Sequence, residues 1–261
     1  MDRGFLFADG VYESIRTYNK KLFRLNDHLE RLKRSLAEIK IDHNDFDSFQ
    51  EIVYGLIEKN KIKDEALIYV QITRGSAFPR SHRFPQQKTN STIYISATDL
   101  PLNKGNKING IKVILHEDLR WLRCDIKSTS LLPAVLVNQK AKEAGAEEAI
   151  LHRNGLITEG SHTNFFAVKD DMVYTAPLSN LILEGITRRV VLDLCDQMKT
   201  EVKEEHIKKD ELNNFNEFFV TSTTKEITPV IQIDNWKING RMLGSVTKNI
   251  QVAFKELTKT Y

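Results

Sequence analysis

The sequence predicts a mixed α+β or α/β protein with two domains, and three observations support this prediction. The chain has 261 residues, which is enough for one large domain or two medium ones. Strand-like and helix-like segments alternate along its length. A polar stretch rich in turn-forming residues interrupts them near residue 100. We therefore expect a small N-terminal α/β domain at 1–102, a linker at 103–110 and a larger domain at 111–261.

The pattern of apolar residues divides the first domain into strands and helices. Apolar and polar residues alternate on both sides of a Tyr-Asn-Lys-Lys turn, which predicts a β-hairpin. From Leu25 to Ile39 the apolar residues recur every three or four positions, which predicts a helix that Asn26 can cap. In order, we predict strands at 11–17 and 21–25, helices at 25–39 and 46–57, and strands at 68–75 and 91–99.

The second domain carries two turn signals that predict further hairpins. Asn154 and Gly155 separate two strand-like runs, and Asp170 and Asp171 separate two more. Gly145 is placed to end a helix. In order, we predict a strand at 111–118, a helix at 131–144, the two hairpins, a helix at 185–199, a strand at 218–224 and a closing helix at 245–261.

The bulk composition favours a cytoplasmic protein that binds small molecules. The 38 basic and 35 acidic residues give a net charge of +3, which singles out neither nucleic acid nor membrane as a partner. Cys124 and Cys195 are too few for a disulfide framework and are expected to be reduced. No apolar run is long enough to span a bilayer, and the N-terminus lacks a signal-peptide pattern. The histidines lack ligand spacing, so we predict no metal site.

Lys127 lies in an unusual setting for a lysine of this chain. The segment Arg-Trp-Leu-Arg-Cys-Asp-Ile precedes it, and a helix-like run follows. Burial disfavours the charged form of a lysine, and a neutral amine is the form that Schiff-base chemistry requires. The competing interpretation is a lysine whose stem lies on the protein while its ammonium group reaches water. From this segment alone, the second interpretation is favoured.

Three other features are compatible with a bound anionic cofactor. Glu159 lies at the end of a predicted strand and is followed by small hydroxyl residues, although a glutamate in a turn is usually just solvated. Gly185, Ile186 and Thr187 open one predicted helix, and Ser222-Thr223-Thr224 follow a strand. The free amides of a helix N-terminus together with a hydroxyl group bind phosphate well, but ordinary capping explains the same pattern.

Together these segments resemble a known family. In order they read DGVYE, HLERL, DIKS, AILHR-x-G-x-ITEGSxTN, LILEGITR and TSTTKEITPV. This order is similar to that of the class IV aminotransferases, fold type IV enzymes that depend on pyridoxal 5′-phosphate, from Arg3 to the final helix. RWLRCDIKS and TRGSAFPRSHRFP are most similar to the D-amino-acid enzymes of the family. The resemblance implies a larger C-terminal cofactor-binding domain, with the cofactor in the cleft between the two domains.

The resemblance also implies a role for individual residues. Lys127 matches the lysine that is bonded to the cofactor at rest and later moves the Cα proton of the substrate. Glu159 matches the carboxylate that pairs with the pyridine nitrogen and keeps it protonated. Tyr12 matches a tyrosine near that lysine and the substrate. The remaining matches are phosphate contacts from Arg31, Ile186, Thr187, Ser222 and Thr223, and a contact with the cofactor ring from Leu183.

The expected substrates follow from the same resemblance. Arg80 and His82 match a basic site that holds the substrate carboxylate in D-amino-acid enzymes and reaches across from the partner subunit, and Thr224 is a further substrate contact. We expect a homodimer that moves an amino group between a D-amino acid, such as D-alanine or D-glutamate, and pyruvate or 2-oxoglutarate by a ping-pong mechanism. The alternatives are an L-branched-chain aminotransferase, an aminodeoxychorismate lyase, and a binding protein that retains the fold without catalysis.

The sequence departs from the family pattern in three places. His162 stands where a small hydroxyl residue is expected, so its ring could narrow the pocket or change cofactor contacts. The loop that carries Arg80 and His82 is one residue longer, which could displace the carboxylate site. Relatives usually carry a short strand-forming region before the segment that matches Asp2-Arg3-Gly4. We therefore expect either that the start of the sequence is truncated or misassigned, or that the first sheet lacks those edge strands.

Overall fold

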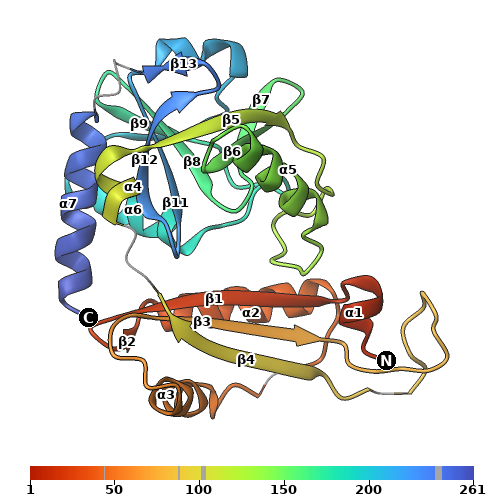
Figure 1. Cartoon of the computed structure of the whole chain (residues 1–261). Helices are drawn as coiled ribbons and strands as arrows, with labels where there is room; N and C mark the ends of the chain where they lie inside the picture. Colours follow the sequence, from red (N-terminus) through yellow and green to blue (C-terminus); the bar gives the residue numbers. More distant parts are fainter. Residues whose placement is uncertain (44, 88, 101–103, 239–242) are drawn as a thin grey trace. The chain divides into compact units, whose positions relative to one another are not determined.

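A computed structural model describes residues 1–43, 45–87, 89–100, 104–238 and 243–261 of the chain, which divides into two compact units (Figure 1). The first unit comprises Met1–Pro101, Ile126–Leu131 and Tyr261, and the second comprises Leu102–Asp125 and Leu132–Thr260. The segment 126–131 therefore belongs to the first unit, although we assigned it by sequence to the second domain. The predicted linker contains helix α4 (Lys104–Asn109), and its residue 103 lies outside the described residues.

The first unit is an antiparallel sheet of strand order β2-β1-β3-β4, with helices packed on β1 and β4. The predicted hairpin is confirmed: β1 and β2 are joined by Asn19 and Lys20, whose φ angles are 47° and 67°. The helix at 25–39 is also confirmed, but Arg24 rather than Asn26 is its N-cap. The elements are α1 (Arg3–Phe7), β1 (Gly10–Tyr18), β2 (Lys21–Leu22), α2 (Leu25–Glu38), α3 (Phe49–Lys59), β3 (Ala66–Thr73) and β4 (Thr92–Asp99).

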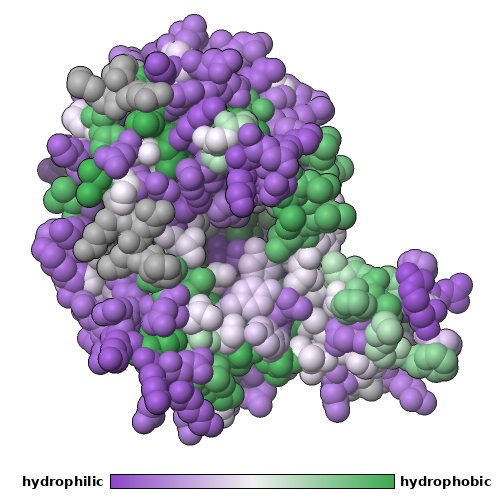
Figure 2. All heavy atoms as spheres, viewed as in Figure 1, coloured by the Kyte–Doolittle hydropathy of each residue, from purple (hydrophilic) through white to green (hydrophobic). Residues whose placement is uncertain are grey.

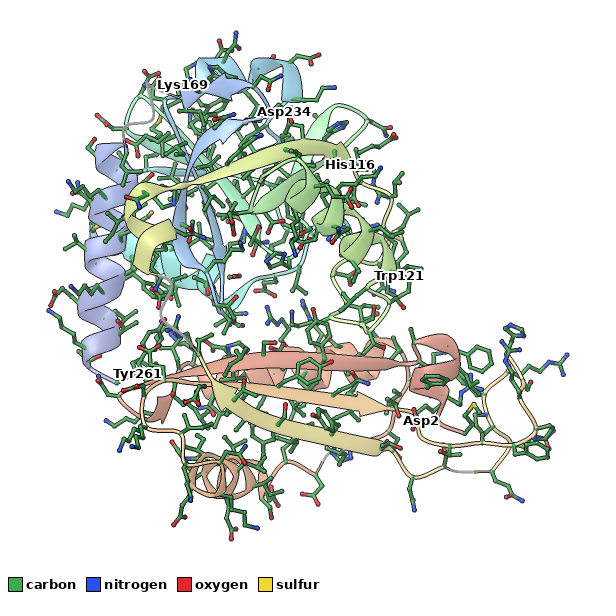
Figure 3. All side chains as sticks on the ribbon, viewed as in Figure 1. Asp2, His116, Trp121, Lys169, Asp234 and Tyr261 are labelled. Carbon is green, nitrogen blue, oxygen red and sulfur yellow. The ribbon has the colours of Figure 1, made fainter. Side chains whose placement is uncertain are left out.

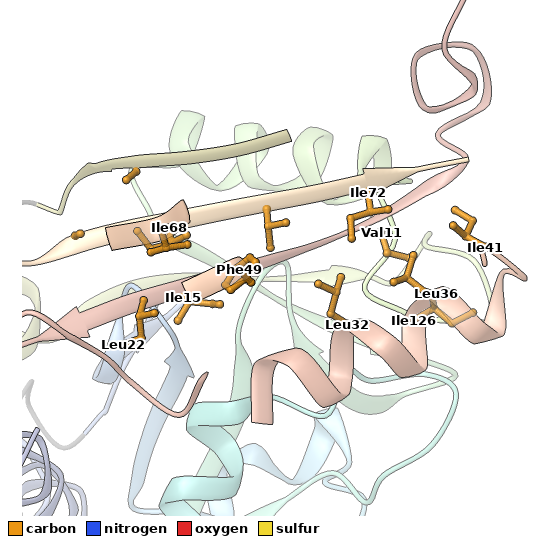
Figure 4. Packing of buried hydrophobic residues seen from close by; sticks show 14 of the residues in the cluster. Val11, Ile15, Leu22, Leu32, Leu36, Ile41, Phe49, Ile68, Ile72 and Ile126 are labelled. Carbon is orange, nitrogen blue, oxygen red and sulfur yellow. The ribbon is translucent and has the colours of Figure 1, made fainter. Parts of the chain in front are cut away.

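The core of the first unit forms where α2 and α3 cover the sheet (Figure 4). Leu32 and Leu36, four residues apart on α2, are buried with Phe49 of α3. On β3 every second residue is buried, as expected for a strand with one face on a core. Ile126, from the segment that follows in the sequence only after β5, is 5% exposed and belongs to the same cluster.

The segment 126–131 is fixed to β1 by main-chain hydrogen bonds. Tyr12 N donates to the Lys127 carbonyl at 3.0 Å, and Thr129 N donates to the Gly10 carbonyl at 3.0 Å. Val11 and Ser128 form an antiparallel bridge between these bonds. The backbone of Lys127 is therefore held on β1 from one side, while Ile126 anchors it in the core.

The second unit is built on a sheet whose described strands follow the order β10-β9-β8-β11-β12-β5-β6-β7, with β13 paired to β12. Both predicted hairpins are confirmed, and their turn residues Asn154, Gly155, Asp170 and Asp171 have positive φ. The strands are β5 (Ile111–Glu117), β6 (Glu148–Arg153), β7 (Leu156–Gly160), β8 (Asn164–Lys169), β9 (Met172–Thr175), β10 (Val202–Glu204), β11 (Glu217–Ser222), β12 (Glu226–Ile233) and β13 (Trp236–Lys237).

The helices of the second unit pack on this sheet: α5 (Leu132–Glu143) lies on β5 and β6, α6 (Ile186–Gln197) on β11, and α7 (Ser245–Lys259) on β11 and β12. A short 3₁₀ helix, η1 (Lys209–Asn214), precedes β11. The three helices match the predicted ones to within three residues at each end. Within the described ranges, no helix combines the length and the apolar character needed to cross a bilayer.

Strand β12 is the longest element that sequence patterns did not predict. Pro229 argues against a strand at 226–233 because proline cannot donate a ladder hydrogen bond. In the structure, β12 pairs with β11 along Glu226–Val230 and with β5 only from Val230 onward. The ladder with β5 therefore requires no donor at Pro229.

Candidate active site

The first group of predicted site residues gathers around Lys127 in the first unit. The Lys127 side chain is half-buried, and its Nζ atom lies 4.3 Å from the centroid of the Tyr12 ring. Its backbone N–H donates to Ser35 Oγ of α2 at 3.3 Å, in addition to the main-chain bond from Tyr12. Strand β1 and helix α2 thus hold Lys127 next to Tyr12, as the resemblance implied.

Arg31, also predicted as a site residue, is held by a buried carboxylate. Its Nε and one terminal nitrogen donate to the two oxygens of Glu13 at 2.7 and 2.9 Å, and His28 Nδ1 lies 2.7 Å from the same carboxylate. Burial would raise the pKa of Glu13, but the charges of Arg31 and His28 outweigh burial and lower it far below its ordinary value. Burial also lowers the pKa of His28, against the opposing effect of Glu13. Glu13 was not identified from the sequence.

Arg80 and His82 lie in the exposed loop between β3 and β4, and both contact one ring of α1. The Arg80 guanidinium carbon lies 4.4 Å from the Phe7 centroid, and the His82 ring centroid lies 5.3 Å from it. The structure therefore brings these two predicted substrate-binding residues together on a shared surface of the first unit. Phe7 was not predicted as a site residue from the sequence.

Glu159 lies at the end of β7 in the second unit, where it is 4% exposed and accepts three hydrogen bonds. Arg120 donates to Oε1 at 2.6 Å, while Asn164 Nδ2 and the Leu183 backbone N–H donate to Oε2, each at 3.0 Å. Burial raises the pKa of Glu159, and Arg120 opposes this shift. A carboxylate has about four lone-pair positions, so one acceptor position remains for a further donor.

Arg120 is a second site residue that the sequence analysis missed. Its guanidinium forms a two-point ion pair with Asp118, at 2.9 and 3.0 Å, and uses its remaining terminal nitrogen for Glu159. Asp118 immediately follows β5, a strand that runs parallel to β6 and β12. Charged residues two positions apart just beyond the carboxyl end of a buried parallel strand are a signal that could have identified this pair.

The two predicted phosphate-binding segments lie around Asn164, the residue that donates to Glu159. Thr221, which precedes Ser222, is paired with Asn164 across β11 and β8. On its other side Asn164 donates to the Leu183 carbonyl at 2.8 Å, and a Cβ on Gly185 would approach Asn164 Oδ1 to 2.0 Å. Only glycine therefore fits at 185, directly before Ile186 and Thr187, without displacing Asn164.

These residues fit the cofactor that the resemblance implies. The N-cap residue of α6 is Gly185, which has no side chain to cap the helix, so the first amides of α6 are suited to a phosphate group. Ser222 ends β11, and its Oγ accepts from Lys225 N at 3.1 Å, which fixes the turn that also contains Thr223 and Thr224. The remaining acceptor position of Glu159 suits a protonated ring nitrogen. Within the second unit, Glu159 and the two predicted phosphate-binding segments are thus linked by the contacts of Asn164.

Comparison with known proteins identifies the family to which these motifs belong. The model of the family described as amino-transferase class IV matches residues 10–233. A D-alanine aminotransferase of Bacillus licheniformis is 45% identical, over 97% of this chain and 89% of the relative. The branched-chain amino acid aminotransferase of Escherichia coli superposes with a TM-score of 0.89 at 28% identity, covering 99% of this chain and 88% of that one. A branched-chain enzyme of T.th., solved with pyridoxamine 5′-phosphate, gives a TM-score of 0.88 at 25% identity, over 100% of this chain and 88% of that one.

Replacing Glu13 with glutamine should destabilise the protein by about 3–5 kcal/mol, because Arg31 then stays buried without its counter-charge. The lowered pKa of Glu13 means that its pairing stabilises the fold fully above its ordinary value of 4.5, and that this stabilisation is lost as the pH falls from there toward the folded pKa. The free energy of unfolding, measured by urea titration at several pH values, should therefore fall less steeply on acidification in Glu13→Gln than in wild type. Glu30→Gln, on the exposed side of α2, is the control; parallel pH profiles for Glu13→Gln and wild type would contradict the assignment.

Proposed function

Because this chain belongs to the class IV aminotransferases, we propose that it transfers the amino group of a D-amino acid to a 2-oxo acid, with pyridoxal 5′-phosphate as its cofactor. D-Alanine and D-glutamate are the proposed amino acids, and pyruvate and 2-oxoglutarate are the proposed acceptors. The observation that carries this proposal is the 45% identity with a D-alanine aminotransferase over 97% of the chain. The two branched-chain enzymes compared above share the fold at lower identities of 28% and 25%.

The residues of the first unit are proposed to carry out the proton transfer. When bound, pyridoxal phosphate supplies an aldehyde that bonds to an amine and a protonated ring that withdraws electrons from the substrate Cα. Lys127 would hold the cofactor through its amine, and that amine, when free, would move the proton at the substrate Cα. Tyr12 orients that amine, since its ring lies 4.3 Å from Nζ.

The residues of the second unit are proposed to hold and polarise the cofactor. Glu159 pairs with the protonated ring nitrogen, and Arg120 and Asn164 keep its carboxylate oriented for this contact. Leu183 would contact the ring, and Ile186, Thr187, Ser222 and Thr223 would hold the phosphate group. Arg31 is also a proposed phosphate contact. Thr224 and the pair Arg80 and His82 contact the substrate. In the second half of the ping-pong cycle, a 2-oxo acid takes the amino group and Lys127 returns the proton to Cα.

The proposed enzyme is a homodimer, and an exposed apolar surface supports this assignment. Helix α5 is apolar on two faces: Val137 and Ala141 are buried against the sheet, whereas Leu132, Val135 and Leu136 are more than half exposed. Figure 2 shows apolar side chains gathered over this part of the second unit. In the loop after β5, Trp121, labelled in Figure 3, is 44% exposed, and the neighbouring Leu122 is 60% exposed. Monomeric proteins seldom expose an apolar surface of this kind. We also propose a cytoplasmic location, which the two free cysteines support.

The substrate assignment is tested by a screen of the purified enzyme supplied with pyridoxal phosphate. D-Alanine with 2-oxoglutarate should react with a kcat/KM at least about a hundredfold above that of L-leucine, the range a site built for one enantiomer can reach. Aminodeoxychorismate should yield no 4-aminobenzoate. Activity with L-leucine alone would replace the D-specific assignment with that of a branched-chain enzyme. A colourless protein whose spectrum ignores added cofactor would indicate a binding protein.

The role of Lys127 is tested by reduction with borohydride, which fixes a lysine-bound cofactor permanently. Lys127→Ala should trap no cofactor and should lose at least about a hundredfold in kcat, because the group that moves the Cα proton is missing. Lys203→Ala is a matched control, since Lys203 also faces a tyrosine ring, that of Tyr174 at 5.7 Å. Mass spectrometry of tryptic peptides identifies the modified lysine, and trapped cofactor in Lys127→Ala would assign the role to another residue.

The proposed interface is tested by charged substitutions on the exposed face of α5. Val135→Asp combined with Leu136→Asp should shift the protein from dimer to monomer at micromolar concentration, because an interface then buries two unpaired carboxylates. Sedimentation equilibrium gives the mass directly. Val252→Asp on α7 is the control, as Val252 and Leu136 are both 57% exposed. A dimer that survives the double substitution would place the interface elsewhere.

A further inference from the structure

We propose that Phe7 is a positioning residue for substrate binding: its ring holds Arg80 and His82 in place and leaves their charge and hydrogen-bond donors available to a carboxylate. This inference rests on the proposed function, because it takes Arg80 and His82 to be the groups that bind the substrate carboxylate. Phe7 ends α1, and the loop that carries the two basic residues lies beside that helix in the first unit (Figure 1).

The contacts of Phe7 are unusual for a half-buried side chain. The guanidinium carbons of Arg80 and Arg3 lie 4.4 and 4.8 Å from its ring centroid, and the His82 ring centroid lies 5.3 Å away. Arg80 and His82 are two residues apart in an exposed loop. One aromatic ring therefore accounts for the placement of both side chains.

The cations of this region are held in two different ways. Arg3 and Arg74 are committed to a carboxylate: both Nε atoms donate to Asp9 Oδ2 at 2.8 Å. Arg80, by contrast, forms no ion pair with any residue that the structure describes. Its guanidinium group instead lies over the Phe7 ring. A ring face attracts a cation without using its N–H donors. Arg80 is thus ordered while its charge stays available.

The backbone of the same loop is held by Arg3, one of the two arginines that bind Asp9. Arg3 is buried, and its terminal nitrogen donates to the carbonyl of Ser81, the residue between Arg80 and His82, at 2.7 Å. Burial would raise the pKa of Asp9, but hydrogen bonds from Arg74 and Arg3 outweigh it and lower the pKa. Asp9 therefore stays ionised at neutral pH and keeps Arg3 in place.

Helix α1 is itself tied to the sheet, which gives Phe7 a fixed base. The Asp2 carboxylate caps α1 by accepting from Gly4 N at 2.7 Å. Its other oxygen accepts from Thr73 on β3 at 2.9 Å and from Thr92 on β4 at 2.7 Å. The two ends of the loop and the helix that supports it are thus joined at one carboxylate. The result is a preorganised pair of basic side chains in a loop that would otherwise have to order on binding.

The test compares Phe7→Ala and Phe7→Leu with wild type in the holoenzyme. Both variants should raise KM for D-alanine and for pyruvate by about tenfold, the factor expected when one or two side chains must be ordered on binding, and should leave kcat within about twofold. Phe7→Tyr keeps the ring face and should restore the wild-type KM. Leucine retains apolar packing without a ring, so rescue by Phe7→Leu would show a mere packing role and overturn the inference.

Two further measurements separate positioning from general damage. Trypsin should cleave after Arg80 and Arg83 faster in Phe7→Ala and Phe7→Leu than in wild type, because the loop is less ordered in these variants. Phe5→Ala is the matched control, since Phe5 lies on the same helix and is 84% exposed. Its KM and its cleavage rate should equal those of wild type. Equal cleavage rates in the Phe7 variants and wild type would refute the inference without any appeal to activity.

The substitution Arg80→Ala makes the outcomes distinguishable. If Phe7 acts through Arg80, the effects of Phe7→Ala and Arg80→Ala on KM should combine to less than their product in the double variant. Fully multiplicative effects would refute the inference while leaving the aminotransferase activity intact. A raised KM in Arg80→Ala with no change in Phe7→Ala would do the same. Failure of the wild-type enzyme to use D-alanine would instead refute the proposed function, and the trypsin comparison would still decide whether Phe7 orders the loop.

Discussion

The position of Lys127 depends on one constraint, the main-chain pairing of the segment 126–131 with β1. Main-chain hydrogen bonds join Tyr12 to Lys127 and Thr129 to Gly10, and the Thr129 hydroxyl donates to the Ala8 and Gly10 carbonyls at 3.0 and 3.2 Å. Burying Ile126, which is 5% exposed, anchors the backbone of this segment in the core, and Lys127 Nζ lies beside the Tyr12 ring, 4.3 Å from its centroid.

Carboxylates that are buried or largely buried hold several other cations, each within its own unit. Glu13 holds Arg31 and His28, Asp9 holds Arg3 and Arg74, and Asp118 shares Arg120 with Glu159. In each group a guanidinium is bound by more than one acceptor, which fixes the direction of its fork as well as its position. A buried carboxylate deprived of its partners would be strongly unfavourable. The site is therefore rigid for the same reason that its residues are difficult to substitute.

Much of this arrangement was predictable from the sequence, and the rest was not for physical reasons. Periodicity and turn chemistry predicted the helices at Leu25–Glu38 and Ile186–Gln197 and both Asn-Gly and Asp-Asp hairpins, because these signals are local. The family motifs pointed to Lys127 and Glu159 from the sequence alone. The placement of Ile126 in the first core was not predictable, because pairing with β1 is a long-range choice that no local pattern encodes. Glu13 and Arg120 lie inside the motifs DGVYE and RWLRCDIKS but were missed, like Phe7, because each acts on the position of another residue.

His162 illustrates how the second unit accommodates a departure from the family pattern. The turn 160–163 is held by Glu148: one carboxylate oxygen accepts from Ser161 N at 3.1 Å and from its hydroxyl at 2.5 Å, and the other accepts from Thr163 Oγ1 at 3.1 Å. His162 Nδ1 lies 3.2 Å from the second oxygen, and the side chain is 44% exposed. The imidazole of His162 thus contacts Glu148, the carboxylate that also holds the turn, and much of its ring is exposed to solvent. Glu159 and Asn164, on either side of this turn, keep their hydrogen bond, in which Asn164 Nδ2 donates to Glu159 Oε2 at 3.0 Å.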